Sequence, residues 1–451
     1  MTLIRGAEGI FTGLPGEAMR AHGAIRIEGD RIAAIGDLAP EPGEHVIDAT
    51  GCVIYPGLVS THHHLFQSIL KGVSSGINLP LMDWLRSVPH AYWSEIGEDE
   101  LYVAARIGLV ELLLSGTTTA ADHHYMFSDT YRFDPADVIF AAARDLGMRL
   151  VFCRGGATVF RTFDTLGYKP MPTEPLDAMI KSVEACAQRY HDPSPASMSR
   201  VVFAPTAPPW ALAVPELKVV ADAARRLGLR LHSHMSETTD YVDFCREKFG
   251  KRPIHWMAEH DWLGPDVWFA HLVHVDAEEM QLLLDTGTGM AHCPQSNCRL
   301  GSGVAPADLM AAAGGAVSLA VDGAASNESA DMISEMHSAW HTHRALKGAA
   351  ATTVEDVVRW ATVNGARVLG MPDIGVLAPG KLADLAVFDL ASPRYFGLHD
   401  KLIGPVIGAG TPDLKLLMVG GRVVVENGAI PGFDLEGLRR EAARVVTRLM
   451  H

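Results

Sequence analysis

Short apolar runs recur along the chain, and each of them stops at a polar residue. Between the runs lie stretches in which apolar residues return every three or four positions, which is typical of amphipathic helices. Eight repeats of this alternation predict an α/β fold in which parallel strands, joined by helical crossovers, close into a (β/α)₈ TIM barrel. The expected strands are 53–59, 117–122, 149–154, 200–205, 229–231, 267–270, 289–292 and 316–321.

An open, doubly wound sheet is the alternative architecture for this pattern. We favour the barrel, because an open sheet would not bring the ends of the first and eighth strands together. Four of the expected helices also stop at a glycine, which readily adopts the left-handed backbone that ends a helix. These helices are 99–115, 135–146, 215–227 and 276–286, followed by Gly116, Gly147, Gly228 and Gly287.

The two ends of the chain show a different pattern. Residues 23–35 predict two short strands around a turn at Gly29-Asp30, and residues 416–425 predict a hairpin that turns at Gly420-Gly421. A further strand is expected at 385–389. Since neither end is long enough to form a core alone, we expect one small composite β-sandwich. It would consist of residues 1–56 and 372–451, interrupted by the barrel of residues 57–371.

Three histidines and an aspartate follow three of the expected strands. His62 and His64 end the first strand, His234 follows the fifth, and Asp322 follows the eighth. Side chains alternate along a strand, so His62 and His64 share a face while His63 points away. Because the carboxyl ends of barrel strands converge on one face, these residues predict a single metal site. Imidazole and carboxylate ligands suit Zn²⁺, with Fe²⁺ as the other candidate.

Each of these residues, taken alone, can instead have a structural role. A His-x-His pair can pack in a core or lie on the surface, and an aspartate after a strand can cap a helix. Such roles do not account for three strand ends at once. A set of three histidines and one aspartate also leaves a coordination position for water, as a catalytic site requires.

Composition narrows the classes of function. The 451 residues carry a formal net charge of −15, which argues against nucleic acid as a partner. No signal peptide is evident, and no apolar run reaches the roughly 18 residues of a membrane span. The six cysteines form no CxxC pair, so the chain is expected in a reducing cytoplasm. The sequence is compatible with a homo-oligomer.

The order of these motifs resembles the amidohydrolase superfamily over nearly the whole chain. Within it, the sequence is similar to the branch of cytosine and guanine deaminases and triazine hydrolases, which use one metal ion. Relatives with two ions carry a lysine at the end of the fourth strand, and residues 203–208 contain none. The matching segments are 56–64, His234 with Glu237, 270–271, 292–297, 300–306, 321–327 and 377–385.

This resemblance implies hydrolytic deamination at an amino-bearing ring carbon. Asp322 would bind the ion and move the proton of the attacking water to the leaving ammonia. Glu237 would protonate the neighbouring ring nitrogen, and a solvated helix-terminal carboxylate is its alternative role. His271 would orient the water, with His274 as its rival. His292 is expected behind the ligands or facing the substrate.

Substrate choice must come from the loops on the same face. Gln67 offers both edges of an amide to a ring, and Trp84 would stack on that ring or simply pack in the core. Tyr125 and Arg154 would read an oxo group far from the ion, although Arg154 can also serve a structural ion pair. The segment 158–173 adds aromatic side chains, which are Phe160, Phe163 and Tyr168.

The resemblance therefore implies a small bicyclic aminoheterocycle as substrate. An oxidised pterin such as isoxanthopterin is favoured slightly over 8-oxoguanine or guanine, because the aromatic segment could accept a wider ring. A triazine chlorohydrolase or aminohydrolase is a further alternative. A non-catalytic scaffold is disfavoured, because such members usually lose metal ligands.

Overall fold

The computed structural model describes residues 1–159, 171–410 and 413–450. Its largest sheet is parallel and has the strand order β15-β14-β13-β12-β11-β10-β9-β8-β16. The last barrel position is split into β15 and β16, and β16 pairs with β8, so the sheet closes on itself. The expected TIM barrel is therefore confirmed. Its strands are β8 (Leu58–His64), β9 (Thr117–His124), β10 (Arg149–Arg154), β11 (Ser199–Phe203), β12 (Leu231–Met235), β13 (Val267–His271), β14 (Gly289–His292), β15 (Val317–Leu319) and β16 (Asp322–Gly323).

The first barrel strand begins later than the sequence predicted. Residues 53–56 belong to β7 (Cys52–Pro56), which pairs with strands of another sheet, and the barrel strand starts at Leu58. Gly57 lies between the two strands. A larger residue would not fit at this position, because a Cβ there would lie 2.3 Å from the Thr118 side chain. Both strands are buried on each side, so the apolar run continues through the change of sheet and hides it.

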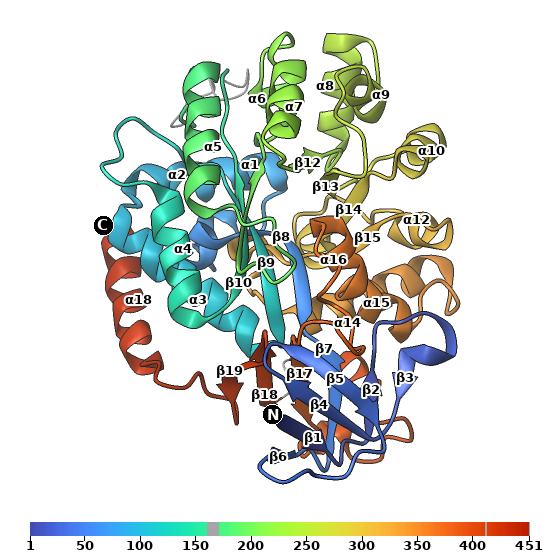
Figure 1. Cartoon of the computed structure of the whole chain (residues 1–451). Helices are drawn as coiled ribbons and strands as arrows, with labels where there is room; N and C mark the ends of the chain where they lie inside the picture. Colours follow the sequence, from blue (N-terminus) through green and yellow to red (C-terminus); the bar gives the residue numbers. More distant parts are fainter. Residues whose placement is uncertain (160–170, 411–412, 451) are drawn as a thin grey trace.

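Helices surround the barrel (Figure 1). The four helices expected from glycine-terminated periodicity are present, and α4 (Pro135–Leu146) and α10 (Ala277–Thr286) end at left-handed glycines with φ of 71°. The aromatic residues predicted at Phe160, Phe163 and Tyr168 lie outside the described residues. The other two expected helices are α3 (Glu98–Leu114) and α7 (Glu216–Arg226). Further main helices are α1 (Leu81–Ser87), α5 (Leu176–Tyr190), α8 (Thr239–Phe249), α9 (Pro253–Ala258), α11 (Pro294–Arg299), α12 (Ala307–Ala312), α14 (Met332–Lys347), α15 (Val354–Trp360), α16 (Val363–Leu369) and α18 (Leu435–Leu449).

Two smaller sheets lie at one end of the barrel (Figure 1). One has the order β5-β4-β1-β6, and the other has the order β19-β18-β17-β7-β2-β3, which combines strands from both ends of the chain. The turns expected at Gly29-Asp30 and Gly420-Gly421 are confirmed. Their strands are β1 (Thr2–Arg5), β2 (Gly9–Phe11), β3 (Arg20–Ala21), β4 (Ala24–Glu28), β5 (Arg31–Gly36), β6 (His45–Asp48), β17 (Leu385–Asp389), β18 (Leu414–Val419) and β19 (Arg422–Glu426).

One apolar cluster includes residues of both small sheets. Ile25 and Ile27 enter it from β4, and Ile54, Val387 and Leu416 enter it from the six-stranded sheet. Their alternation along the strands follows the period of two that buries one face of each sheet. Among the described residues, no helix combines the length and the apolar character that crossing a bilayer requires.

A buried ion pair joins the barrel to the six-stranded sheet. Arg149, the first residue of β10, lies 3.1 Å from Asp384, the residue before β17, and both side chains are at most 1% exposed. Asp384 also accepts a hydrogen bond of 2.7 Å from the backbone of Gly420. Arg149 donates further to the carbonyls of Ala196 and Ser197. Both buried charged groups therefore have hydrogen-bond partners within the protein, as the burial of charge requires.

Removing one member of this pair should be costly, because the other charge stays buried without a partner. We expect Asp384→Ala to lower the free energy of unfolding by about 3–5 kcal/mol, measured by urea denaturation. As a control, Glu436→Ala removes an exposed partner of Arg439 and should leave the free energy of unfolding nearly unchanged. Equal losses in the two variants would contradict a structural role for the buried pair.

Candidate metal centre and active site

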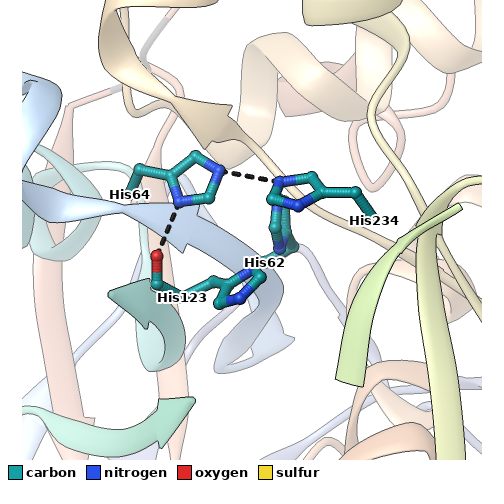
Figure 2. A group of neighbouring side chains, drawn as sticks. All are labelled: His62, His64, His123 and His234. Carbon is teal, nitrogen blue, oxygen red and sulfur yellow. Dashed lines mark hydrogen bonds between the residues drawn. The ribbon is translucent and has the colours of Figure 1, made fainter. Parts of the chain in front are cut away.

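The barrel brings the expected ligands together. His62 and His64 end β8, His234 lies in β12, and Asp322 opens β16. Ligand atoms of His62, His64, His123 and His234 all lie within 4.8 Å of one another, and those of His62, His234, His271 and Asp322 form an overlapping set. Figure 2 shows the first group, with the rings of His64 and His234 facing each other. Because both sets share His62 and His234, they describe a single location.

Backbone carbonyls decide which ring nitrogens of His64 and His234 carry a proton. His64 Nδ1 lies 2.7 Å from the carbonyl oxygen of His123, and His234 Nδ1 lies 2.6 Å from that of Thr206. A carbonyl only accepts, so each Nδ1 is the donor, and in the neutral imidazole each Nε2 keeps a lone pair. The two Nε2 atoms are 3.1 Å apart (Figure 2). With no proton to share, they repel each other unless a cation binds both.

The same reasoning applies to His62. His232 Nδ1 lies 3.0 Å from the carbonyl oxygen of Trp268 and must donate to it, which leaves His232 Nε2 as an acceptor. His62 Nδ1 lies 2.8 Å from that acceptor and therefore donates. The lone pair of His62 is thus on Nε2, an atom that is buried and makes no hydrogen bond within the described ranges.

Asp322 supplies the fourth donor. Its Oδ1 lies 3.3 Å from the Nε2 atoms of both His62 and His64, and its Oδ2 accepts hydrogen bonds from Ser296 at 2.6 Å and Ser326 at 3.1 Å. Three imidazole lone pairs and one carboxylate oxygen therefore converge. These donors fit a divalent metal ion. Burial favours the neutral rings that such an ion needs, since it lowers the pKa of His62 to about 3.

Strand geometry at two of these residues is unusual. His271 and Asp322 have φ angles of +75° and +60°, which non-glycine residues seldom adopt. Such conformations persist where the surrounding structure fixes them, and they concentrate at functional sites. At Asp322, the carbonyl accepts a hydrogen bond of 2.5 Å from His63 Nδ1. The middle histidine points away from the site, as expected, and holds the backbone of the aspartate.

Glu237 and His271 lie beside this centre. His271 Nε2 is 3.5 Å from Glu237 Oε2, and His271 Nδ1 donates to Asn297 Oδ1 at 3.0 Å. The carboxylate of Glu237 also accepts a long hydrogen bond of 3.4 Å from Ser302. Burial raises the pKa of Glu237 above its usual value, although His271 opposes the rise. A buried carboxyl with a raised pKa is suited to give and take a proton near neutral pH.

The rival histidines lie elsewhere. His274 Nε2 bonds the carbonyl of Ser302 at 2.8 Å, and His292 Nε2 faces His343 Nε2 at 3.2 Å. In the part of the chain that the structure describes, neither residue lines the cavity beside the ligands. His271, in contrast, lines this cavity, which is consistent with the choice of His271 over His274.

A cavity opens over the candidate ligands. Three of the four residues expected to bind substrate line it, namely Gln67, Trp84 and Tyr125. Gln67 is buried, and its Oε1 makes no hydrogen bond to any described residue. The other wall residues of the cavity include Thr206, Trp210, Tyr241 and Leu300, together with Glu237 and His271.

Arg154 is not brought to the cavity lining formed by the described residues. Its guanidinium makes a two-point ion pair with Glu174, at 2.5 and 2.8 Å, and lies 3.8 Å above the Phe127 ring. The prediction that Arg154 reads a ring oxygen finds no support here, because a carboxylate already neutralises the charge. The structural ion pair considered from the sequence is what the structure contains.

The sequence interpretation missed several residues that contact the candidate ligands. His232 lies two positions before His234, so the strand period placed it on the same face, and that signal was available. Ser296 and Asn297 lie within a recognised motif, yet nothing in the pattern assigned them to Asp322 and His271. His123, the last residue but one of β9, was expected on this face of the barrel and joins the imidazole cluster there.

Comparison with known proteins decides the family. Residues 53–424 match the amidohydrolase family. The chain belongs to this family. It is 49% identical over 468 residues to an isoxanthopterin deaminase from an unknown prokaryotic organism, covering 100% of this chain and 97% of that protein. It is 37% identical to the 8-oxoguanine deaminase of Pseudomonas aeruginosa, covering 97% of this chain and 96% of that one.

A solved structure agrees. The atrazine chlorohydrolase of Arthrobacter aurescens TC1, complexed with zinc, superposes with a TM-score of 0.92 at 29% identity and covers 99% of this chain and 100% of its own. The present amidohydrolase, with deaminases among its relatives, is an enzyme that hydrolyses carbon–nitrogen bonds. The histidine and aspartate cluster fits the divalent metal on which the family depends.

The overlapping donor sets predict how many metal ions each chain binds. We expect one divalent ion per chain in metal analysis of the purified protein, because the two sets share His62 and His234. His234→Ala should weaken metal binding by at least about tenfold, since it removes a proposed ligand. His274→Ala, which alters a nearby histidine bonded to Ser302, should leave the metal content unchanged. Two tightly bound equivalents would contradict the single site.

Proposed function

We propose that this enzyme is a metal-dependent deaminase of an oxidised bicyclic aminoheterocycle, with isoxanthopterin as its substrate. In the reaction, water adds to the ring carbon that bears the amino group, the carbon–nitrogen bond breaks, and ammonia leaves. The observation that carries the proposal is the convergence of three histidine lone pairs and a carboxylate beside the buried acid Glu237. The similarity to isoxanthopterin deaminase over the whole chain supports the choice of substrate.

His62, His64, His234 and Asp322 would hold the ion, which we propose to be Zn²⁺ rather than Fe²⁺. Imidazole nitrogens and a carboxylate oxygen are donors that zinc prefers, and a related amidohydrolase structure contains zinc. When bound, such an ion lowers the pKa of water enough to supply a nucleophile near neutral pH.

The side chains around the ion manage the protons. Asp322 accepts the proton of the attacking water and passes it to the departing ammonia, while Ser296 and Ser326 hold its other oxygen in place. Glu237 donates to the ring nitrogen next to the attacked carbon, which makes that carbon more electrophilic. His271, anchored by Asn297, orients the water. General acid–base groups of this kind each contribute about 10²- to 10⁴-fold in rate.

The cavity suggests how the ring is recognised. Gln67 Oε1 is a buried acceptor without a partner among the described residues, and leaving it so is costly. The amino group and ring N–H of an aminopyrimidinone provide the missing donors. Trp84 and Tyr125 line the cavity with aromatic surface, which suits a flat bicyclic ring. Gln67 would thus read the half of the ring that reacts.

The same aminopyrimidinone half occurs in 8-oxoguanine, so its deamination is the second candidate, favoured by the 37% identity to an 8-oxoguanine deaminase. The similarity to an atrazine chlorohydrolase keeps triazines as a third class to be tested.

We also propose that residues 1–56 and 372–451 form one composite β-sandwich domain and that residues 57–371 form the barrel domain. The apolar cluster common to the two small sheets supports this division. The six free cysteines support a reducing cytoplasm as the location.

A substrate panel tests the function directly. We expect ammonia release from isoxanthopterin to exceed that from 8-oxoguanine, guanine and pterin in kcat/KM, and no release of chloride or alkylamine from triazines. Preference for 8-oxoguanine would establish the second candidate instead. Release of chloride or alkylamine without ammonia would overturn the deaminase assignment.

The role of Glu237 has a separate test. We expect Glu237→Gln to retain its metal but to lose at least about 10²-fold in kcat, because a required proton donor is removed. Glu279→Gln is a matched control, because Glu279 is also a buried glutamate. Its carboxylate accepts hydrogen bonds from Arg252 and from the Ile254 backbone, and it does not line the cavity formed by the described residues. Near-normal turnover in the Glu237 variant would show that another group is the acid.

A further inference from the structure

We propose that His232 is a positioning residue, which together with Trp268 fixes the ring of His62 in the form that binds the metal ion. This inference rests on the proposed metal centre and does not depend on the identity of the substrate. His232 is fully buried in β12, two residues before His234, and therefore faces the same side of the strand.

The ring of His232 lies between His62 and Trp268. Its Nε2 is 2.8 Å from His62 Nδ1, its Nδ1 is 3.0 Å from the carbonyl oxygen of Trp268, and its plane stacks on the indole at 4.5 Å between centroids. Both of its nitrogens are therefore used. The stack and the two bonds leave the ring a single orientation.

The direction of each hydrogen bond follows from the Trp268 carbonyl, at which this series of bonds ends. The Trp268 carbonyl can only accept, so the proton of His232 is on Nδ1 and its Nε2 can only accept. His62 must then carry its own proton on Nδ1. The nitrogen that faces Asp322 and the other ligands is left with its lone pair, which is the form that coordinates a metal.

Trp268 also holds the strand that carries His62. Its indole Nε1 donates to the carbonyl oxygen of Thr61 at 3.1 Å, and its backbone pairs with His232 in the sheet. A closed circuit results, from His62 through His232 and Trp268 to Thr61, the neighbour of His62 in β8. The circuit connects β8, β12 and β13 across the inside of the barrel.

His62 differs in this from the other two proposed histidine ligands. His64 and His234 donate Nδ1 directly to backbone carbonyls. His62 reaches a carbonyl only through a second imidazole, so its proton position depends on a side chain that a mutation can remove. Without an acceptor at Nδ1, the His62 ring would be free to hold its proton on Nε2, where it blocks the metal.

Two substitutions separate this role from packing. His232→Phe keeps a flat ring but removes the acceptor, and we expect zinc binding to weaken about 10- to 100-fold in competition with a chelator. In His232→Gln the side-chain amide oxygen can take the place of Nε2 and accept from His62. That variant should lose less than about tenfold. Equal weakening in both variants would overturn the proposal.

A control and a spectroscopic measurement complete the test. His292→Phe replaces another fully buried histidine, one that bonds His343, and should leave the zinc affinity unchanged even if it lowers stability. Nitrogen-15 NMR of the metal-free protein should show the His62 proton on Nδ1 in the wild type and on Nε2 in His232→Phe. An unchanged proton position in that variant would refute the role of His232. Wild-type protein that binds no zinc would instead refute the metal centre.

Discussion

Four electron-pair donors share a small space in this protein with no proton between them. The backbone fixes this state, because carbonyls of His123, Thr206 and Trp268 take the imidazole protons on the far side of the rings, directly or through His232. Lone pairs at 3.1–3.3 Å repel one another unless positive charge lies among them. The strand ends place these donors, the buried serines hold the second oxygen of Asp322, and the cavity opens over them.

The candidate ligands could be predicted from the sequence, because their positions follow from the strand period and from where the strands end. A period of two places His62 and His64 on one face, and the convergence of parallel strand ends brings His234 and Asp322 to them. The helices and hairpins were predictable for the same reason, since glycines mark their ends. The boundary at Gly57 was not, because the residues on both sides are buried and one apolar run serves two sheets.

Long side chains and distant contacts defeated prediction at other positions. Arg154 lies at a strand end that faces the site, but its long side chain pairs with the carboxylate of Glu174 instead. The sequence pattern did not reveal the position of the segment that contains Glu174. The pairing of His271 with Asn297 and of Asp322 with Ser296 depends on how a short helix after β14 sits in three dimensions. Substrate identity has the same difficulty, because it depends on loops that have no periodicity.

The eighth strand position has a consequence for the mechanics of the barrel. The strands β8 and β16 are joined through two residue pairs, Asp322 with His63 and Gly323 with His64, so this closing seam of the barrel lies at the candidate ligands. An ion held by the proposed ligands His62, His64 and Asp322 would span that seam, and His63 donates a hydrogen bond across it to the Asp322 carbonyl. Binding of such an ion would link the metal to closure of the cylinder and would raise the stability of the closed form.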